Sequence, residues 1–171
     1  MTISPRALAS LFWLVGLLGG WAHAVDQIYG KLTVDGDRWE VLFTFDIGFS
    51  EGDWTDPDTP QKPREYLLKL NEAGHELLRR QTVAAVRASL EFGKSEYVIK
   101  FPDYETEPRG FPELMNDGAY LRVQVTGVLD RGRLEISVKD GDWPSFVIMS
   151  GEGETEEFRT FWSGDRGWLV E

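Results

Sequence analysis

Apolar and polar residues alternate along the chain from residue 28 onward, and this alternation predicts a β-hairpin. Ile28, Leu32 and Val34 alternate with residues that are mostly polar. After Asp35-Gly36-Asp37, every second residue from Trp39 to Ile47 is apolar. A sustained period of two, with β-branched and aromatic side chains, is typical of a half-buried strand. Asp-Gly between the two runs supplies the positive φ that a tight hairpin turn needs.

The pattern changes to helical periodicity between about residue 64 and residue 90. Apolar residues recur there at spacings of three and four positions, as they do on one face of a helix. We expect Gly74 to divide the segment, with Asn71 as the N-cap of a second helix that begins near Glu72. The helical segment is inserted between the second and third predicted strands. Its recurring residues are Leu67, Leu70, Leu77, Leu78, Ala84, Ala85 and Ala88.

Short alternating runs separated by turns make up the rest of the chain. They lie at residues 97–101, 120–129, 134–138, 146–149, 158–162 and 168–170. Short strands at a spacing of roughly 8–12 residues are typical of a sandwich or barrel. We therefore predict a mainly β fold, namely an antiparallel β-sandwich, immunoglobulin-like or similar, of about eight strands with the helical segment inserted.

The same alternation predicts the hydrophobic core, because residues two apart on a strand point to the same face. The sequence contains no cysteine, so burial of this face has to stabilise the fold without disulfides. The expected core residues are Trp39, Val41, Phe43, Phe45, Leu121, Val123, Val125, Leu134, Ile136 and Val138.

The first 24 residues have the order of a secretory signal peptide. One cation, Arg6, precedes an uncharged run of 18 residues from Ala7 to Ala24, which ends in Ala22-His23-Ala24. Small residues at those two alanine positions are what signal peptidase recognises. An uncleaved anchor is the alternative, because 18 residues is close to the shortest bilayer span. We expect cleavage and export to the periplasm or outside a bacterial cell, leaving residues 25–171 as one domain with no membrane span.

The net charge of the chain limits the classes of molecule that it is expected to bind. The sequence has 18 Lys and Arg against 29 Asp and Glu, a net charge of −11. Removing Arg6 with the signal peptide leaves 17 cations and a net charge of −12. Such a surface repels phosphate backbones and anionic lipid headgroups, so we expect no nucleic-acid partner. A protein or glycan of the cell envelope remains a possible partner, as does a cation.

Catalytic and metal-binding motifs are scarce. Without cysteine there is no thiolate nucleophile, and His75 is the one histidine that would remain after cleavage. We interpret His75 as a surface side chain, and a histidine-rich metal site is excluded. The sequence has no G-x-S-x-G nucleophile elbow. We expect no cofactor and no metal, although the many carboxylates keep open a small hydrolase with Asp or Glu as acid and base.

Two tryptophans in predicted turns and loops are the candidate binding residues. Trp54 lies in the long loop from Gly48 to Pro63, and Trp143 lies beside a turn in Asp142-Trp143-Pro144. Exposed aromatic residues on loops can stack on sugars or anchor a protein partner. The alternative is that both cap the ends of the core. Carboxylates lie on both sides of Trp54 in the sequence, and they form either a calcium site or a solvated acidic loop. They are Glu51, Asp53, Asp56 and Asp58.

These observations favour a non-catalytic exported domain that binds a protein, a glycan or a cation through its loops. The small extracytoplasmic hydrolase is the alternative. A pair of carboxyl groups about 5–9 Å apart in a sizeable cleft would favour the hydrolase, whereas carboxylates scattered over convex loops would not.

Overall fold

The computed structural model describes residues 27–52, 62–105, 118–151 and 156–170. The predicted signal peptide and four of the candidate binding residues, Asp53, Trp54, Asp56 and Asp58, lie outside the described residues. The strands are β1 (Gln27–Asp35), β2 (Arg38–Asp46), β3 (Leu90–Glu91), β4 (Tyr97–Lys100), β5 (Tyr120–Val128), β6 (Leu134–Val138), β7 (Ser145–Ser150), β8 (Glu157–Phe161) and β9 (Trp168–Val170). The helices are α2 (Ile47–Glu51), α3 (Arg64–Lys69), α4 (Glu72–Ser89) and α5 (Pro102–Glu105).

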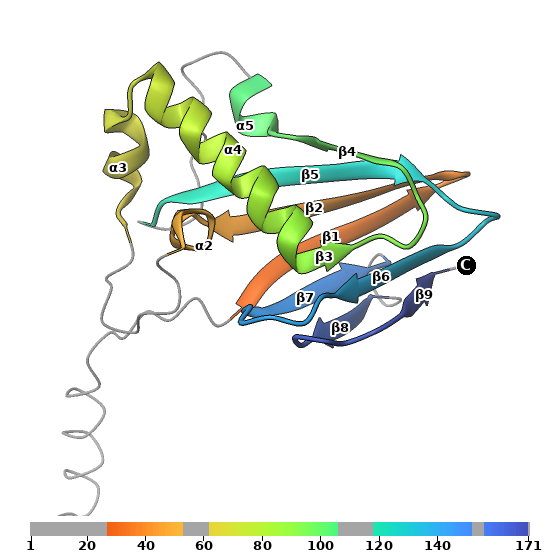
Figure 1. Ribbon diagram of the computed structural model, residues 1–171. Coiled ribbons are helices and arrows are strands. Elements are labelled where there is room, and N and C mark those ends of the chain that lie inside the picture. The colour runs from red at the N-terminus through yellow and green to blue at the C-terminus, as the bar shows by residue number, and fades with distance from the viewer. Residues whose placement is uncertain (1–26, 53–61, 106–117, 152–155, 171) are drawn as a thin grey trace, which may run out of the picture.

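The prediction of a mainly β fold is confirmed, in the form of two sheets with some helices (Figure 1). The larger sheet has six strands in the order β4-β5-β2-β1-β7-β8, and the smaller has three in the order β3-β6-β9. The predicted hairpin forms β1 and β2, with Gly36 at a φ of 61° in its turn.

The prediction of a wholly antiparallel arrangement is wrong, because the larger sheet is mixed. β1 and β7 run parallel, with Ile28 opposite Phe146 and Gly30 opposite Ile148. The physical reason is the connection: the chain enters β7 from β6, which belongs to the smaller sheet, and not from a hairpin within the larger sheet. A tight hairpin turn forces two strands to pair antiparallel, whereas a strand that follows one from another sheet can pair in either direction.

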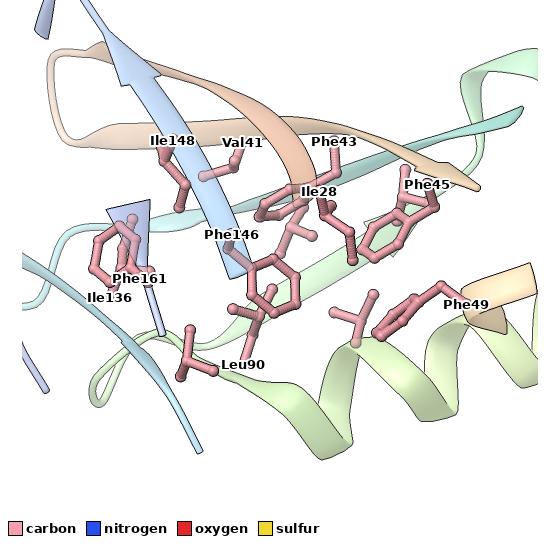
Figure 2. Packing of buried hydrophobic residues seen from close by; sticks show 14 of the residues in the cluster. Ile28, Val41, Phe43, Phe45, Phe49, Leu90, Ile136, Phe146, Ile148 and Phe161 are labelled. Carbon is pink, nitrogen blue, oxygen red and sulfur yellow. The ribbon is translucent and has the colours of Figure 1, made fainter. Parts of the chain in front are cut away.

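The core lies between the larger sheet on one side and α4 with the smaller sheet on the other (Figure 1). All the core residues predicted from the alternation are confirmed, since each is at most 2% exposed. Figure 2 shows Phe146 of β7 pointing from the larger sheet toward Leu90, the first residue of β3. Phe43 lies in edge contact with Phe146, with ring centroids 6.2 Å apart.

Helix α4 begins where the sequence predicts it and buries Leu78 as expected, but the rest of its buried face differs from the predicted one. The side chain of Asn71 caps it by accepting a 2.9 Å hydrogen bond from the backbone N–H of Gly74. Leu77 is 46% exposed, whereas Thr82 is fully buried. The Thr82 hydroxyl can be buried because it lies 2.8 Å from both the hydroxyl of Ser50 and the carbonyl oxygen of Leu78.

Helix α2 replaces the end of the predicted second strand. The carboxylate of Asp46 accepts a 2.8 Å hydrogen bond from the backbone N–H of Gly48 and so caps the helix, which Gly52 ends at a φ of 84°. Ile47 is therefore helical, although it is buried as the alternation predicts. Within the described residues, no helix combines the length and the apolar character needed to cross a membrane.

Candidate binding surface

The larger sheet has one face that the core does not use. Along β2, Trp39, Val41 and Phe43 point toward α4 and the smaller sheet, so the residues between them point the opposite way. We call this second side the open face. Its side chains are mostly exposed or half-buried, and Tyr29 of β1 is 57% exposed.

Three large aromatic side chains are exposed at the β1–β7–β8 end of the larger sheet. Tyr29 is 57% exposed, Phe158 is 66% exposed, and Trp162, which follows buried Phe161, is 62% exposed. Half-buried apolar side chains lie between them, because Tyr29 is opposite Val147 and Phe158 is opposite Met149. We call this group the aromatic patch; its members are Tyr29, Val147, Met149, Phe158 and Trp162.

Polar residues border the aromatic patch. Lys31 lies opposite Met149 on one side, and Thr160 lies opposite Val147 on the other. The neighbouring strands add both signs of charge, including Arg38 and Lys100 with Glu40. The patch is therefore an apolar area with a hydrated rim, which differs from the strongly acidic character of the chain as a whole.

A shallow groove of about 860 Å³ continues the open face across β4, β5, β2 and β1. The exposed side chain of Val98 lies in it, together with Lys100 and Arg38. The amide of Gln124 donates a 2.8 Å hydrogen bond to the carboxylate of Glu40 in the same groove. The groove therefore combines charged side chains with apolar ones, and two of its polar groups, Gln124 and Glu40, are bonded to each other.

Trp143, the one of the two candidate tryptophans that the structure describes, lies at the end of the core. It is half-buried, and its ring meets the ring of Phe49 edge-on, with centroids 6.4 Å apart. This position matches the core-capping alternative for this tryptophan. A contact of its remaining exposed surface with a partner stays a prediction.

The predicted binding loop has a fixed base. Lys62 pairs with the carboxylate of Glu51, and the hydroxyl of Tyr66 donates a 2.9 Å hydrogen bond to the same carboxylate. The ammonium of Lys62 also lies 5.1 Å from the centre of the Tyr66 ring. Desolvation lowers the pKa of Lys62, and the charge of Asp46 opposes that change. The chain is thereby held together on both sides of residues 53–61.

His75 joins α4 to α5 and is not an isolated surface side chain. Its Nδ1 lies 2.9 Å from the hydroxyl oxygen of Tyr104, and the guanidinium of Arg79 lies 4.6 Å from the centre of the Tyr104 ring. Desolvation lowers the pKa of His75, and the charge of Arg79 lowers it further. Desolvation raises the pKa of Tyr104 to about 12, against the charge of Arg79. Both shifts favour the neutral forms of the two groups, whose contact joins α4 to α5.

Buried carboxylates in the described residues already have structural partners. Asp103 has a fully buried side chain that accepts hydrogen bonds from the backbone N–H of Arg122, at 2.8 Å, and from its Nε, at 2.6 Å. Asp46 caps α2. These contacts fix α5 against β5 and the end of β2 against α2.

Half-buried Glu40 shares the groove on the open face with Asp35 and Glu96, and a second group of carboxylates shares a hollow on the smaller sheet, where they are exposed. Glu91 and Glu135 line a groove of about 380 Å³ on the outer side of the smaller sheet. Glu91 is 59% exposed and lies 3.6 Å from the ammonium of Lys139. A general acid for glycoside cleavage needs a carboxyl group in a less polar site than this one. Across the described ranges, no group of three or more Asp, Glu and His side chains is placed to hold a metal ion.

No model of a known protein family matches the chain, and no curated protein matches it. Among the described residues, the aromatic patch is the group of large apolar side chains that is exposed to solvent and available to a partner. Exposed Tyr, Phe and Trp side chains can bury a large area against a partner with little loss of side-chain entropy. The patch was missed in the sequence because exposure on a strand depends on which face the rest of the fold covers.

Proposed function

We propose that the chain is an exported, non-catalytic domain that binds a protein partner through the aromatic patch. The observation that supports this proposal is the exposure of three large aromatic side chains, each more than half exposed: Tyr29 and Phe158 on the open face of the larger sheet, and Trp162 directly after β8. Large apolar side chains gathered in this way on a soluble surface are characteristic of interaction sites.

The composition of the patch favours a protein over a glycan as the partner. Aromatic residues and methionine are enriched at the centres of protein interfaces, whereas acidic residues are depleted there. On β7, Val147 lies opposite Tyr29 and Met149 lies opposite Phe158, so each of these two aromatic side chains has an apolar cross-strand neighbour. A glycan-binding surface would gain from hydrogen-bonding groups between the rings, a place that Thr160 alone takes on β8.

The residues before the predicted binding loop lie at the end of the sheet where β1 begins. Residues 53–61 follow α2, which begins directly after β2 ends at Asp46. Because β1 and β2 are antiparallel, that end of β2 lies beside the start of β1, where Tyr29 stands opposite Thr44. Contacts of Trp54, Asp53, Asp56 and Asp58 with the same partner are part of the proposal, because Glu51 and Lys62, which flank this loop in the sequence, are paired with each other next to the end of β2.

Affinity capture tests this proposal with the secreted form of the chain as bait. The variant Tyr29→Ala/Phe158→Ala/Trp162→Ala removes the three exposed rings, and Leu68→Ala/Leu77→Ala is the control because both leucines are exposed on the helices. We expect the wild type and the control to capture the same protein from an extract of the cell envelope, and the triple variant to lose it. The thermal unfolding temperatures of all three should agree within a few degrees.

Equal capture by the triple variant would contradict the proposal, as would a captured polysaccharide with no protein. Release of a product from envelope polymers by the purified domain would instead favour the hydrolase alternative. Substituting Trp54 with Ala then tests the loop separately, because capture that survives the Trp54 change but not the triple change assigns recognition to the sheet face alone.

A further inference from the structure

Strand β8 forms one edge of the larger sheet and has only one partner strand among the described residues. It pairs with β7 from Phe161 opposite Phe146 to Glu157 opposite Ser150. Its other side carries the unpaired backbone groups of an edge strand (Figure 1). The first four residues of β8 are all exposed, and the strand contains no proline.

The side chains of β8 are divided between the two faces. Glu157 and Arg159 share a face with Phe161, which is buried against the core. Phe158 and Thr160 belong to the open face. A charge on the core side of an edge strand discourages an arbitrary neutral strand from pairing there, because the charge would lose water without gaining a partner.

These two charges complement each other when the strand meets a copy of itself. In an antiparallel pair centred on residue 158, residues 157 and 159 of one copy lie opposite residues 159 and 157 of the other. Each Glu157 then faces an arginine and each Arg159 faces a glutamate, while the two Phe158 rings lie opposite one another. Opposite-charge and aromatic pairs directly across a ladder both stabilise it.

Other registers of the same pairing lack this match. Continuing the sheet with both open faces on one side requires that residues of the same face lie opposite each other. A pair centred on Arg159 places two guanidinium groups together, and one centred on Glu157 places two carboxylates together. A pair centred on Thr160 places Arg159 opposite Phe161 and leaves both charges without a counter-ion.

The other edge of the sheet offers no such match. β4 is four residues long and ends at Lys100, with Pro102 two residues further on. A lysine on a short strand that stops before a proline is a typical protection of a sheet edge. The exposed side of β8 is therefore the edge at which a further strand can be accommodated.

We propose that a second copy of this chain pairs with β8 in an antiparallel, two-fold symmetric ladder centred on Phe158. The two larger sheets then form one continuous sheet, and both aromatic patches lie on the same side of it. The ladder shares Phe158 with the aromatic patch, but the paired charges of Glu157 and Arg159 lie on the core side of the strand, so exchanging them leaves the patch unchanged and tests the pairing separately from the proposed function.

Charge exchange tests the pairing. The wild type, Glu157→Arg, Arg159→Glu and the doubly exchanged variant are compared by sedimentation velocity over a range of concentrations. Two-fold symmetry makes each single change replace two opposite-charge contacts by two like-charge contacts, so we expect about ten-fold weaker dimerisation or more. The double exchange restores both pairs and is expected to dimerise like the wild type. A wild type that remains monomeric at every concentration would overturn the proposal, and so would a double variant as weak as the single ones.

Cysteine cross-linking tests the register independently of stability. The chain has no cysteine, so Phe158→Cys introduces the sole thiol. Residues directly opposite in an antiparallel pair are close enough for a disulfide, and Phe158→Cys is expected to give a covalent dimer on mild oxidation. Thr160→Cys is the matched control, because the proposed ladder places it opposite residue 156. A covalent dimer from Thr160→Cys and none from Phe158→Cys would exclude the proposed register.

Discussion

The ring of Phe43 occupies the space that a side chain on Gly30 would need. The two residues are partners across the β1–β2 ladder, and a Cβ added to Gly30 would lie 2.7 Å from Cδ1 of Phe43. Phe43 uses this room to contact Phe45, at 5.5 Å between ring centroids, and Phe146, at 6.2 Å. The glycine in β1 is therefore a packing requirement of the aromatic core and not a turn residue.

The variant Gly30→Ala is expected to lower the free energy of unfolding by about 1–3 kcal/mol, because the added methyl group overpacks a fully buried site. Urea unfolding followed by fluorescence measures the loss. Adding Phe43→Leu creates space for the methyl group, so the double variant should be more stable than the sum of the two single losses predicts. Strict additivity would show that the two sites do not compete for the same space.

Removing the Phe43 ring altogether creates a cavity. Phe43→Ala is expected to cost roughly 3–5 kcal/mol of unfolding free energy, because a buried aromatic ring is lost and the surrounding rings cannot collapse fully. The control is Leu77→Ala on the exposed side of α4, for which the change should stay within about 0.5 kcal/mol. A loss below about 1 kcal/mol for Phe43→Ala would be incompatible with its burial.

The elements with a regular side-chain period could be predicted from the sequence. Residues 39–45 bury every second side chain, so their alternation identified both the strand and its buried face. The helix start was predictable because the side chain of Asn71 satisfies a local backbone donor. Such features depend on residues that are close together in the sequence, so they can be predicted from a short stretch of it.

The features that depend on distant parts of the chain were not predictable. The parallel pairing of β1 with β7 joins residues more than a hundred positions apart. Thr82 is not one of the apolar residues that recur along the helix, and its burial depends in part on a contact with Ser50, which lies on another helix. Likewise, the alternation in β1 placed Tyr29 on the polar side, but the aromatic patch exists because the helical insertion covers the other face of the sheet.

Acidification is expected to weaken the contact between α4 and α5. Desolvation and the charge of Arg79 hold the pKa of His75 below its ordinary value of 6.5 in the folded chain, so the unfolded chain binds the proton first. The free energy of unfolding should therefore decrease as the pH falls below about 6.5, and His75 should contribute no pH dependence well above that value.

Urea unfolding at pH 8, 7, 6 and 5.5 measures this contribution as the difference between the wild type and His75→Gln. Glutamine cannot take up a proton but can still approach the hydroxyl of Tyr104, so the variant retains the other titrations of the chain. The stability of the wild type should fall relative to the variant as the pH decreases. Parallel curves for the two proteins would show that the pKa of His75 does not change on folding.

Substitutions of Trp143 and Trp162 are expected to affect different properties of the protein, the first its stability and the second its binding of a partner. Trp143 is half-buried against Phe49, so Trp143→Ala should lower the free energy of unfolding by about 1–3 kcal/mol. Trp162 is 62% exposed, so Trp162→Ala should leave it within about 0.5 kcal/mol of the wild type. Denaturant unfolding and capture of the partner are measured on both variants. If Trp143→Ala instead leaves stability unchanged and abolishes capture, Trp143 is a contact residue, and the binding surface extends from the patch around the end of the sheet to the base of the loop at Lys62.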